Sequence, residues 1–491
     1  MLPWARITGE RPLNAIPSGK RAPCSLVAPA PHLPQVLQIG QLKMISANSS
    51  FKAIIIGGGP VGLATAHALH LANIDFVLLE RRPAIVEDKG ASLIVHPHTL
   101  RVLHQFGVLD ELLPRGAELS HHLSFLASGH VFNESNRYTQ IRENHGHGPV
   151  AFHRAELVET LYNGLPTTIR ENILTDKKVV DIQTAQDGVT VACADGSTFL
   201  GSIVIGADGV HSKTRLLMRG LALAEDPSRE WDPQQPYTAE YKLLFGSFPS
   251  PSPPGQGYDI QAKDRAIMYF SGPERGWFFL YKRLQKPTSE RTSYTDEDID
   301  KMAKEFAEFP LTRGVKVKDV WPKMLGSGLT NLDEGLVKNW SFGRIVLVGD
   351  ACHKMTTHLG LGFNHGIQDV VVLCNRLRKS LQATPSGKVD ANTLTGVFFE
   401  YAAVRMGSLS SLTGDIYKSG LETRMHAWHN LGYYVLSRYL SVPSAVENLV
   451  MQYMMMPEFR KGQVLDYVFK EERMKGKVSW IYSMGFGQHD D

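Results

Sequence analysis

The sequence has few cysteines and no long apolar run. Its four cysteines, Cys24, Cys193, Cys352 and Cys374, are scattered among 491 residues and form no CxxC pair. This usage is typical of a reducing compartment and argues against a disulfide framework. No uninterrupted apolar stretch reaches the ~18 residues of a membrane-spanning helix. We therefore expect an intracellular protein, either cytoplasmic or held peripherally at a membrane.

The C-terminal region comes nearest to a membrane-interacting sequence. It contains LGYYVLSRYL at 431–440 and LVMQYMMM at 449–456, and the charged residues Arg438 and Glu447 interrupt this apolar region. Apolar segments broken in this way form either core helices or an amphipathic surface that contacts a membrane. Both interpretations stay open, so peripheral membrane contact is a prediction for this region.

The chain also lacks an excess of charge of one sign. Its 52 Lys and Arg residues against 49 Asp and Glu residues give a net charge of +3, with no long basic run. Nucleic-acid binding is therefore not expected. With 43% hydrophobic and 21% charged residues, the composition is that of a globular protein long enough for two or three domains.

The first 50 residues differ from the rest. They are rich in proline, arginine and small residues, and Glu10 is their only acidic residue. One interpretation is a targeting segment, although the prolines would interrupt an amphipathic helix. A second, which we favour, is that Met44 is the true start. In both cases residues 1–50 are expected to form a disordered extension.

What the chain does have is a strong nucleotide-binding signature at residues 51–80, FKAIIIGGGPVGLATAHALHLANIDFVLLE. An apolar, strand-like run leads into glycines, a helix-like stretch follows, and a second apolar run ends on Glu80. This order of strand, glycine turn, helix, strand and acid is the context that a dinucleotide-binding fingerprint requires. The segment therefore predicts an α/β domain that binds an adenine dinucleotide.

Each residue type in this signature has a physical role. Gly57 permits the tight turn, Gly59 lets the backbone approach a pyrophosphate, and Gly62 lets the helix pack against the strand. The N-terminus of the helix then favours anionic phosphates. Glu80 can accept hydrogen bonds from both ribose hydroxyls and would repel a 2′-phosphate, which argues against NADP at this site.

A second glycine-rich signal occupies residues 343–373. A buried, strand-like run delivers Asp350 into a turn, and Gly360-Leu361-Gly362 then opens a helix. An acid at a strand end can bond to a polyol hydroxyl, and helix N–H groups can stabilise negative charge on a ring carbonyl. A third segment, GADGVHSKTR at 206–215, follows another buried, strand-like run.

These three segments, in this order, resemble the FAD-dependent aromatic-hydroxylase family of single-component flavoprotein monooxygenases. The matching motifs are GGGPVG with Glu80, GADGVHSKTR, and VGDACHKMTTHLGLGFNHGIQD at 348–369, and the resemblance spans roughly 51–380. The segments GAS at 90–92, HR at 153–154 and EYKLLFG at 240–246 are similar to one branch. That branch comprises fungal monooxygenases of meroterpenoid and indole-diterpene pathways, often prenyl-chain epoxidases.

The resemblance implies an α/β fold with a Rossmann-like FAD-binding domain, an inserted sheet-rich substrate domain and a helical C-terminal region. The FAD-binding domain is expected to be discontinuous, over 51–225 and 331–390. The substrate domain is expected over 226–330 and the mostly helical region over 391–491. Within the substrate domain, strands are predicted at 239–246, 266–271 and 276–283.

The resemblance also implies roles for individual residues. It places FAD against Gly57, Gly59, Gly62, Glu80, Gly90, Ile94, Arg154, Asp208, Asp350, Gly362, Phe363 and Asn364. It assigns Arg215 and Tyr241 to catalysis or substrate contact. NADPH or NADH would be the co-substrate, with Asp208 linked to both cofactors. Oxygen and an apolar small molecule would be the other reactants.

Three positions depart from the family pattern. Thr357 stands where proline is usual, Leu361 where glutamine is usual, and Phe363 where a small residue is usual. FAD binding is still expected, because the loop glycines and Asn364 are present. The bulk of Phe363 is expected to alter the pocket beside the flavin ring.

A metal site is an alternative interpretation of the same segment. His353, His358 and His365 lie close together in the sequence, but their spacing does not place them on one helical face. Because a flavin-binding loop already accounts for the segment, we predict no metal.

The sequence thus predicts an oxidoreductase. The leading hypothesis is an FAD-dependent, NAD(P)H-consuming monooxygenase that inserts one oxygen atom, by epoxidation or hydroxylation, into an apolar and prenylated secondary metabolite. One alternative is a flavin-dependent reductase or dehydrogenase of prenyl chains. Another is a non-catalytic prenyl-binding protein similar to the GDP-dissociation inhibitors, which share this fold.

Overall fold

The structure is a computed structural model that describes residues 51–88, 90–384, 389–410, 414–440 and 459–485. The predictions for residues 1–50 and for LVMQYMMM at 449–456 therefore lie outside the described residues.

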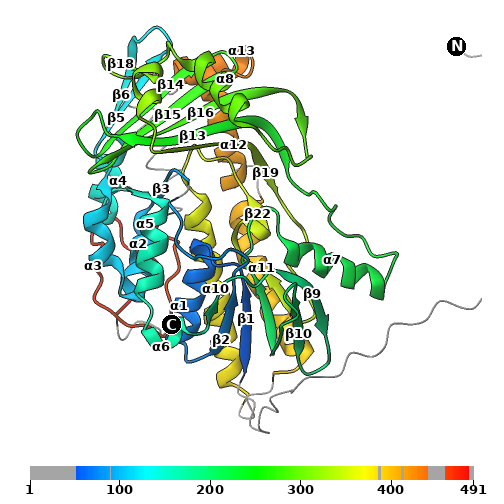
Figure 1. Cartoon of the computed structure of the whole chain (residues 1–491). Coiled ribbons are helices and arrows are strands. Elements are labelled where there is room, and N and C mark those ends of the chain that lie inside the picture. The colour runs from blue at the N-terminus through cyan, green and yellow to red at the C-terminus, as the bar shows by residue number, and fades with distance from the viewer. Residues whose placement is uncertain (1–50, 89, 385–388, 411–413, 441–458, 486–491) are drawn as a thin grey trace, which may run out of the picture. The chain divides into compact units, whose positions relative to one another are not determined.

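A six-stranded, mostly parallel sheet carries the nucleotide-binding signature (Figure 1). Its strands, in spatial order, are β20 (Ser341–Phe342), β21 (Ile345–Leu347), β12 (Ile203–Gly206), β1 (Lys52–Ile56), β2 (Asp75–Leu79) and β8 (Ile173–Leu174). β1 pairs in parallel with both β2 and β12, and α1 (Pro60–Leu71) connects β1 to β2. The strand, turn, helix and strand predicted over 51–80 are therefore confirmed.

Helices pack against this sheet and against one another. α1 contacts α5 (Arg154–Asn163) and α10 (Gly362–Gln382), and α10 contacts α11 (Ala391–Leu409). α10 begins at Gly362, as expected for the helix that the glycine loop at 360–362 opens. The remaining helices are α2 (Pro97–Phe106), α3 (Leu109–Leu112), α4 (Arg137–His145), α6 (Thr167–Arg170), α7 (Lys213–Glu225), α8 (Asp296–Phe306), α9 (Val317–Val320), α12 (Asp415–His426) and α13 (Leu431–Val435).

Two small sheets accompany the parallel sheet. One is an antiparallel sheet of β11 (Thr198–Gly201), β10 (Val189–Cys193) and β9 (Val179–Thr184). A second sheet contains β3 (Ser92–Val95), β7 (Val150–His153) and β4 (Ala117–Glu118). β7 leads directly into α5, which places His153 and Arg154 at a strand-to-helix junction.

An eight-stranded sheet makes up most of the second domain, at the top of Figure 1. Its strands, in spatial order, are β22 (His353–Lys354), β19 (Gly326–Leu336), β13 (Thr238–Pro249), β16 (Arg275–Thr288), β15 (Arg265–Ser271), β14 (Gln256–Ala262), β5 (His121–Leu126) and β6 (Val131–Ser135). Between β16 and β19 the chain also forms a separate hairpin of β17 (Pro310–Thr312) and β18 (Val315–Lys316). β13, β15 and β16 contain the three predicted strands.

The large sheet extends beyond the predicted segment 226–330. β5 and β6 were expected in the FAD-binding domain, but β5 pairs in parallel with β14. β19 continues to Leu336 and pairs with β22, which lies inside the second glycine-rich segment. These pairings join residues far apart in the chain, and the local pattern of a strand does not identify its partner.

The helical prediction for 391–491 holds for the described residues up to 440, and its part over 441–458 lies outside the described residues. α11, α12 and α13 are followed by a π-helical turn, Leu436–Leu440. Among the described residues after 460, no helix or strand is formed. None of the helices in the described ranges has the length and apolar character needed to span a bilayer.

The segment 459–485, which we call the C-terminal strap, runs back along the FAD-binding domain beside α2 and α10 (Figure 1). The side-chain amide of Gln105 both donates to and accepts from the backbone of Leu465, each at 2.8 Å. Gln368 forms the same two-way pair with Gln463 at 3.1 and 2.8 Å. These amides pair with backbone groups of Leu465 and Gln463 that no helix or strand of the strap satisfies.

Candidate active site

A cavity of about 900 Å³ opens at the carboxyl ends of β1, β2 and β12. Ligands bind at this edge in open α/β sheets. The predicted cofactor residues that line it are Gly57, Gly59, Glu80, Arg154, Asp208, Asp350, Gly362 and Phe363. The structure therefore brings most of them together, and the volume is within the range of cofactor sites.

The glycine turn has the geometry that the signature predicts. Gly57 has φ +111°, and a Cβ on Gly62 would lie 1.9 Å from the carbonyl oxygen of Gly57. By contrast, a Cβ on Gly59 would meet nothing within 4 Å. No side chain caps the start of α1. The open side of Gly59 and the uncapped helix N-terminus fit a pyrophosphate group.

Glu80 is held rigidly at the end of β2. Its carboxylate accepts hydrogen bonds from the backbone N–H of Gly58 at 2.6 Å and from the backbone N–H and Nε of Arg82, both at 2.9 Å. Burial opposes its ionisation, but the hydrogen bonds from Arg82 and Gly58 outweigh this effect and lower the pKa of Glu80. An ionised carboxylate at this place fits an adenosine ribose.

Charged residues of both signs face the middle of the cavity. Arg154 begins α5, and burial lowers its pKa. Asp350 lies in the 3₁₀ turn η3 (Gly349–Ala351), where its carboxylate accepts from Nζ of Lys354 at 2.7 Å. This arrangement can bind phosphate and polyol groups.

Asp208 and Arg215 have structural partners. The Asp208 carboxylate accepts from the hydroxyl of Ser212 and from the backbone N–H of Thr214 at 2.9 Å, at the start of α7. Buried Arg215 donates to the carbonyls of Ala351 and Val210, both at 2.8 Å. Asp208 lines the large cavity, whereas Arg215 is not among the residues that line it.

The other predicted cofactor residues, Gly62, Gly90, Ile94 and Asn364, do not line the large cavity. Nδ2 of Asn364 donates to the carbonyls of Ile94 and Gly360 at 2.8 and 2.7 Å, which joins β3 to the start of α10. Gly90 has φ +106°, and a Cβ there would lie 3.4 Å from Cδ of Arg154. These residues support the cavity rather than line it.

Tyr241 lies apart from the cavity. It follows a β-bulge at Ala239 in β13, and its hydroxyl pairs with Nδ1 of His429 at 2.9 Å. It lines a separate pocket of about 80 Å³, together with Thr238, Glu240, Leu332, Glu334, Thr356, Gly420, Thr423 and Arg424. Bulges often redirect side chains near functional sites, but the structure does not bring Tyr241 to the predicted cofactor residues.

A smaller chamber of about 140 Å³ adjoins the large cavity. The residues that line both spaces are Leu93, Lys354, Thr357, Gly362 and Phe363. The rest of the chamber wall is formed by Ser92, Ile94, Met268, Phe270, Phe279, Tyr281, Met355, Thr356 and Gly360. Phe363, the bulky residue expected to alter the pocket, lies at the boundary between the two spaces.

Sequence reasoning missed most of this chamber. Lys354 stands four residues after Asp350, a spacing that could have suggested an ion pair beside the motif. Met268 and Phe279 were inside predicted strands, but no sequence signal indicated which face of the sheet meets the motif. Ser92 falls in the GAS segment that only the family resemblance had singled out.

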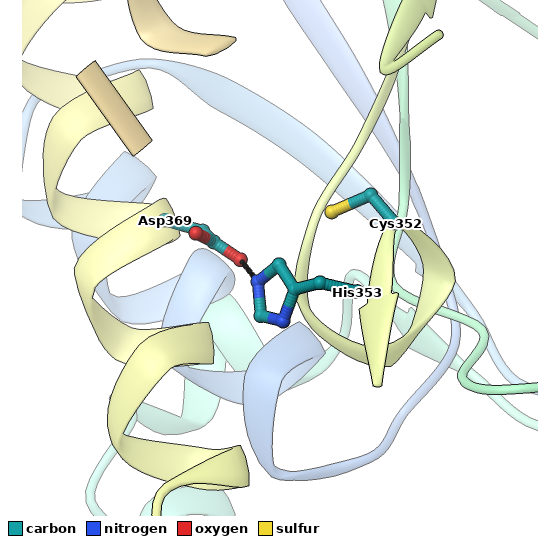
Figure 2. A group of neighbouring side chains, drawn as sticks. All are labelled: Cys352, His353 and Asp369. Atoms are coloured by element: carbon teal, nitrogen blue, oxygen red, sulfur yellow. Dashed lines mark hydrogen bonds and ion pairs between the residues drawn. The ribbon is translucent and has the colours of Figure 1, made fainter. Parts of the chain in front are cut away.

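The histidines considered for a metal site have different partners. Figure 2 shows Nε2 of His353 directed at the Asp369 carboxylate, 2.6 Å away, with Cys352 close by. The other oxygen of Asp369 accepts from Nε of Arg405 at 2.7 Å. Burial raises the pKa of the Cys352 thiol well above its usual value. These contacts form a hydrogen-bonded network that ties β22 to α10 and α11.

Comparison with known proteins agrees with this architecture. Residues 50–391 match the family described as FAD binding domain. The FAD-dependent monooxygenase srdH of Neurospora crassa is 36% identical over 374 residues, which cover 72% of this chain and 82% of srdH. The FAD-dependent monooxygenase ausM of Penicillium brasilianum is 31% identical, over 81% of this chain and 83% of ausM.

Solved structures share the fold at lower identity. Klebsiella pneumoniae HpxO, complexed with FAD and uric acid, has a TM-score of 0.64 at 21% identity, covering 83% of this chain and 97% of HpxO. A salicylate hydroxylase substrate complex has a TM-score of 0.62 at 18% identity, covering 84% of this chain and 98% of the hydroxylase. The chain therefore belongs to the FAD binding domain family and is an FAD-dependent monooxygenase.

Proposed function

We propose that this monooxygenase uses NAD(P)H and O₂ to insert one oxygen atom into an apolar secondary metabolite bound in the smaller chamber. The observation that carries the proposal is that the large cavity and the smaller chamber share lining residues. Lys354, Thr357 and Phe363 line both the cavity that fits FAD and the chamber next to it. A group in the chamber would thus lie beside a cofactor in the larger cavity.

The residues of the large cavity fit FAD. Gly59 and the N-terminus of α1 would hold the pyrophosphate, Glu80 the adenosine ribose, and Asp350 the ribityl chain. The N-terminus of α10 at Gly362 and Phe363 would face the ring system. When bound and reduced, FAD supplies the electrons that activate O₂. The protein binds and orients both partners and excludes water from the chamber.

The rim of the large cavity supports binding of a nicotinamide dinucleotide. Arg81 and Lys213 line this cavity, and neither makes an ion pair with another residue of the described ranges. Both are exposed. Unpaired cations at the mouth of a cavity attract anionic phosphates, so we place the docking of NADPH or NADH here.

Two features support the setting proposed for the reaction. The described cysteines, Cys193, Cys352 and Cys374, are free and buried, which fits an intracellular protein. On the helices that precede residue 441, Phe399 is 72% and Leu431 is 76% exposed. We propose peripheral membrane contact for the C-terminal region, with these exposed side chains among the residues that would meet the lipid.

The enzyme assignment replaces the non-catalytic prenyl-binding alternative, because the relatives are named monooxygenases. The reductase or dehydrogenase alternative is separated from oxygen insertion by isotope labelling. The FAD-loaded protein is incubated with NADPH, ¹⁸O₂ and candidate prenylated and polyketide-derived compounds, and product masses are recorded. We expect one ¹⁸O atom per product molecule. A product without ¹⁸O would contradict the proposal, as would a purified protein with no flavin spectrum.

A further inference from the structure

The smaller chamber has room for a single ring. Its volume of about 140 Å³ is close to that of an engineered apolar cavity of ~150 Å³ that binds benzene. A larger metabolite would therefore place only one end in the chamber, and that end would be the part that is oxidised. This inference rests on the proposed function, in which the large cavity holds FAD.

Most of the chamber wall is apolar. Met268 and Phe270 occupy alternate positions of β15, and Phe279 lies on the neighbouring β16. Residues two apart on a strand share one face of the sheet. This face, with Met355 and Phe363 from the motif loop, favours a hydrocarbon ring or a short branched chain.

Some polar groups on the wall are already paired within the protein. The hydroxyl of Tyr281 pairs with Oγ1 of Thr357 at 2.6 Å. Oγ1 of Thr356 pairs with Oγ of Ser419 at 2.8 Å. These hydroxyls therefore have protein partners without a ligand.

Two other polar groups have unused capacity. The buried Oγ of Ser92 has no hydrogen-bond partner among the described residues, and an unpaired buried hydroxyl is costly. The ammonium group of Lys354 donates to Asp350 at 2.7 Å, and an ammonium group has three N–H donors in all. The pairing of Lys354 with Gly335 of β19 fixes its backbone at the boundary between the two spaces.

We propose that Lys354, assisted by Ser92, determines substrate specificity by binding an acceptor oxygen of the substrate. The oxidised end of the substrate is then a single apolar ring or short branched chain that carries a carbonyl, phenolic or enolic oxygen. Because an ammonium group only donates hydrogen bonds, a hydrocarbon end without oxygen leaves it unpaired. The arrangement favours oxygenation of an oxygen-bearing ring over epoxidation of a plain terminal prenyl group.

The test uses rings of matched size as probes. Phenol and toluene differ by a hydroxyl in place of a methyl group. Their dissociation constants are measured by calorimetry on the FAD-loaded full chain, at a pH where phenol is neutral. Because a hydrogen bond to a charged group is worth more than a neutral one, we expect phenol to bind about tenfold more tightly than toluene. Lys354→Met should abolish this preference and Lys354→Arg should retain it.

Two further variants keep the test decisive. Lys338→Met removes a cation that is paired with Glu230 and lines neither space, and it should leave the phenol-to-toluene ratio unchanged. If Lys354→Met purifies without FAD, Ser92→Ala carries the test, with an expected loss of about threefold in the ratio. Equal binding of the two rings to the wild-type protein, or no binding of either, overturns the inference. Failure of the proposed function would be seen separately, as a missing flavin spectrum or unlabelled product.

Discussion

The guanidinium group of Arg215 donates a hydrogen bond to the carbonyl oxygen of Ala351 at 2.8 Å, and so connects the GADGVHSKTR segment to the turn that carries Asp350. The same group donates to Val210 and lies over the ring of Tyr237, 5.0 Å from its centroid. We therefore propose that Arg215 is a positioning residue for the FAD-binding turn.

Replacing Arg215 should weaken FAD binding more than it slows chemistry. Arg215→Met leaves the buried carbonyl of Ala351 and the partly buried carbonyl of Val210 without this donor, and an unpaired buried carbonyl costs about 1–3 kcal/mol. We expect the dissociation constant of FAD to rise at least about tenfold, with kcat largely restored at saturating FAD. Flavin titration and steady-state rates measure both quantities. A loss of kcat that persists at saturating FAD would instead show a direct catalytic role.

Replacing Tyr241 by phenylalanine should lower stability with little effect on turnover. The change removes the 2.9 Å hydrogen bond to His429 but keeps the buried ring. We expect the free energy of unfolding to fall by about 1 kcal/mol, measured by urea denaturation. The alternative, a substrate-contacting role as the family resemblance implies, predicts a large fall in kcat with unchanged stability.

Two glycine substitutions near the start of α1 should affect different properties. Gly59→Ala should weaken FAD binding, whereas Gly62→Ala should lower stability. Gly59→Ala places its Cβ in open space and should preserve the fold while blocking approach of the FAD pyrophosphate. Gly62→Ala places its Cβ 1.9 Å from the Gly57 carbonyl oxygen and should destabilise the protein, by more than about 2 kcal/mol. Melting temperature without FAD and the dissociation constant of FAD distinguish the two. Equal melting temperatures for the two variants would contradict the geometry.

The network in Figure 2 should be sensitive to loss of one partner. Arg405→Met leaves the buried Asp369 carboxylate without its cation, and breaking a buried pair costs about 3–5 kcal/mol. The double variant with Asp369→Asn removes the charge as well and should recover part of this loss. Denaturation of the wild type, both single variants and the double variant forms the cycle. Additive losses would show that the two groups are not coupled.

Stability should fall as the pH is lowered from about 6.5 to about 4. Burial lowers the pKa of His67, His96, His122 and His145 to about 4. Below the ordinary histidine pKa of ~6.5 the unfolded chain binds protons that the folded chain does not, and each such histidine removes up to about 1.4 kcal/mol per pH unit. Melting temperatures across this range measure the slope.

His145 offers a control for this pH dependence. Neither of its ring nitrogens has a described hydrogen-bond partner, and its ring lies against Trp480 with centroids 4.9 Å apart. His145→Phe should therefore keep the aromatic contact and reduce the pH slope, while stability at pH 7 changes little. An unchanged slope would show that His145 already binds its proton in the folded state.

The parts of the fold that sequence could predict are those set by local pattern. β1, α1 and β2 follow from apolar runs around glycines, and the start of α10 follows from the loop Gly360-Leu361-Gly362. The chamber could not be predicted, because Ser92, Lys354 and Met268 come from three distant segments. Likewise, Asn364 and Arg215 could be assigned to the site by resemblance, but their bonds to backbone carbonyls have no sequence signature.

Because the C-terminal strap packs on residues that are synthesised much earlier, folding of the nucleotide-binding domain depends on a segment that is made late. Gln105 emerges early, yet its hydrogen-bond partner Leu465 is made 360 residues later. At ribosomal rates of about 5–20 residues per second, the partner is absent for roughly 20–70 s. The nucleotide-binding domain, although encoded first, therefore completes its core only after the strap has been made. A premature stop shortly before residue 459 should lower the stability of this domain, because Leu465 and Met474 of the strap belong to its core.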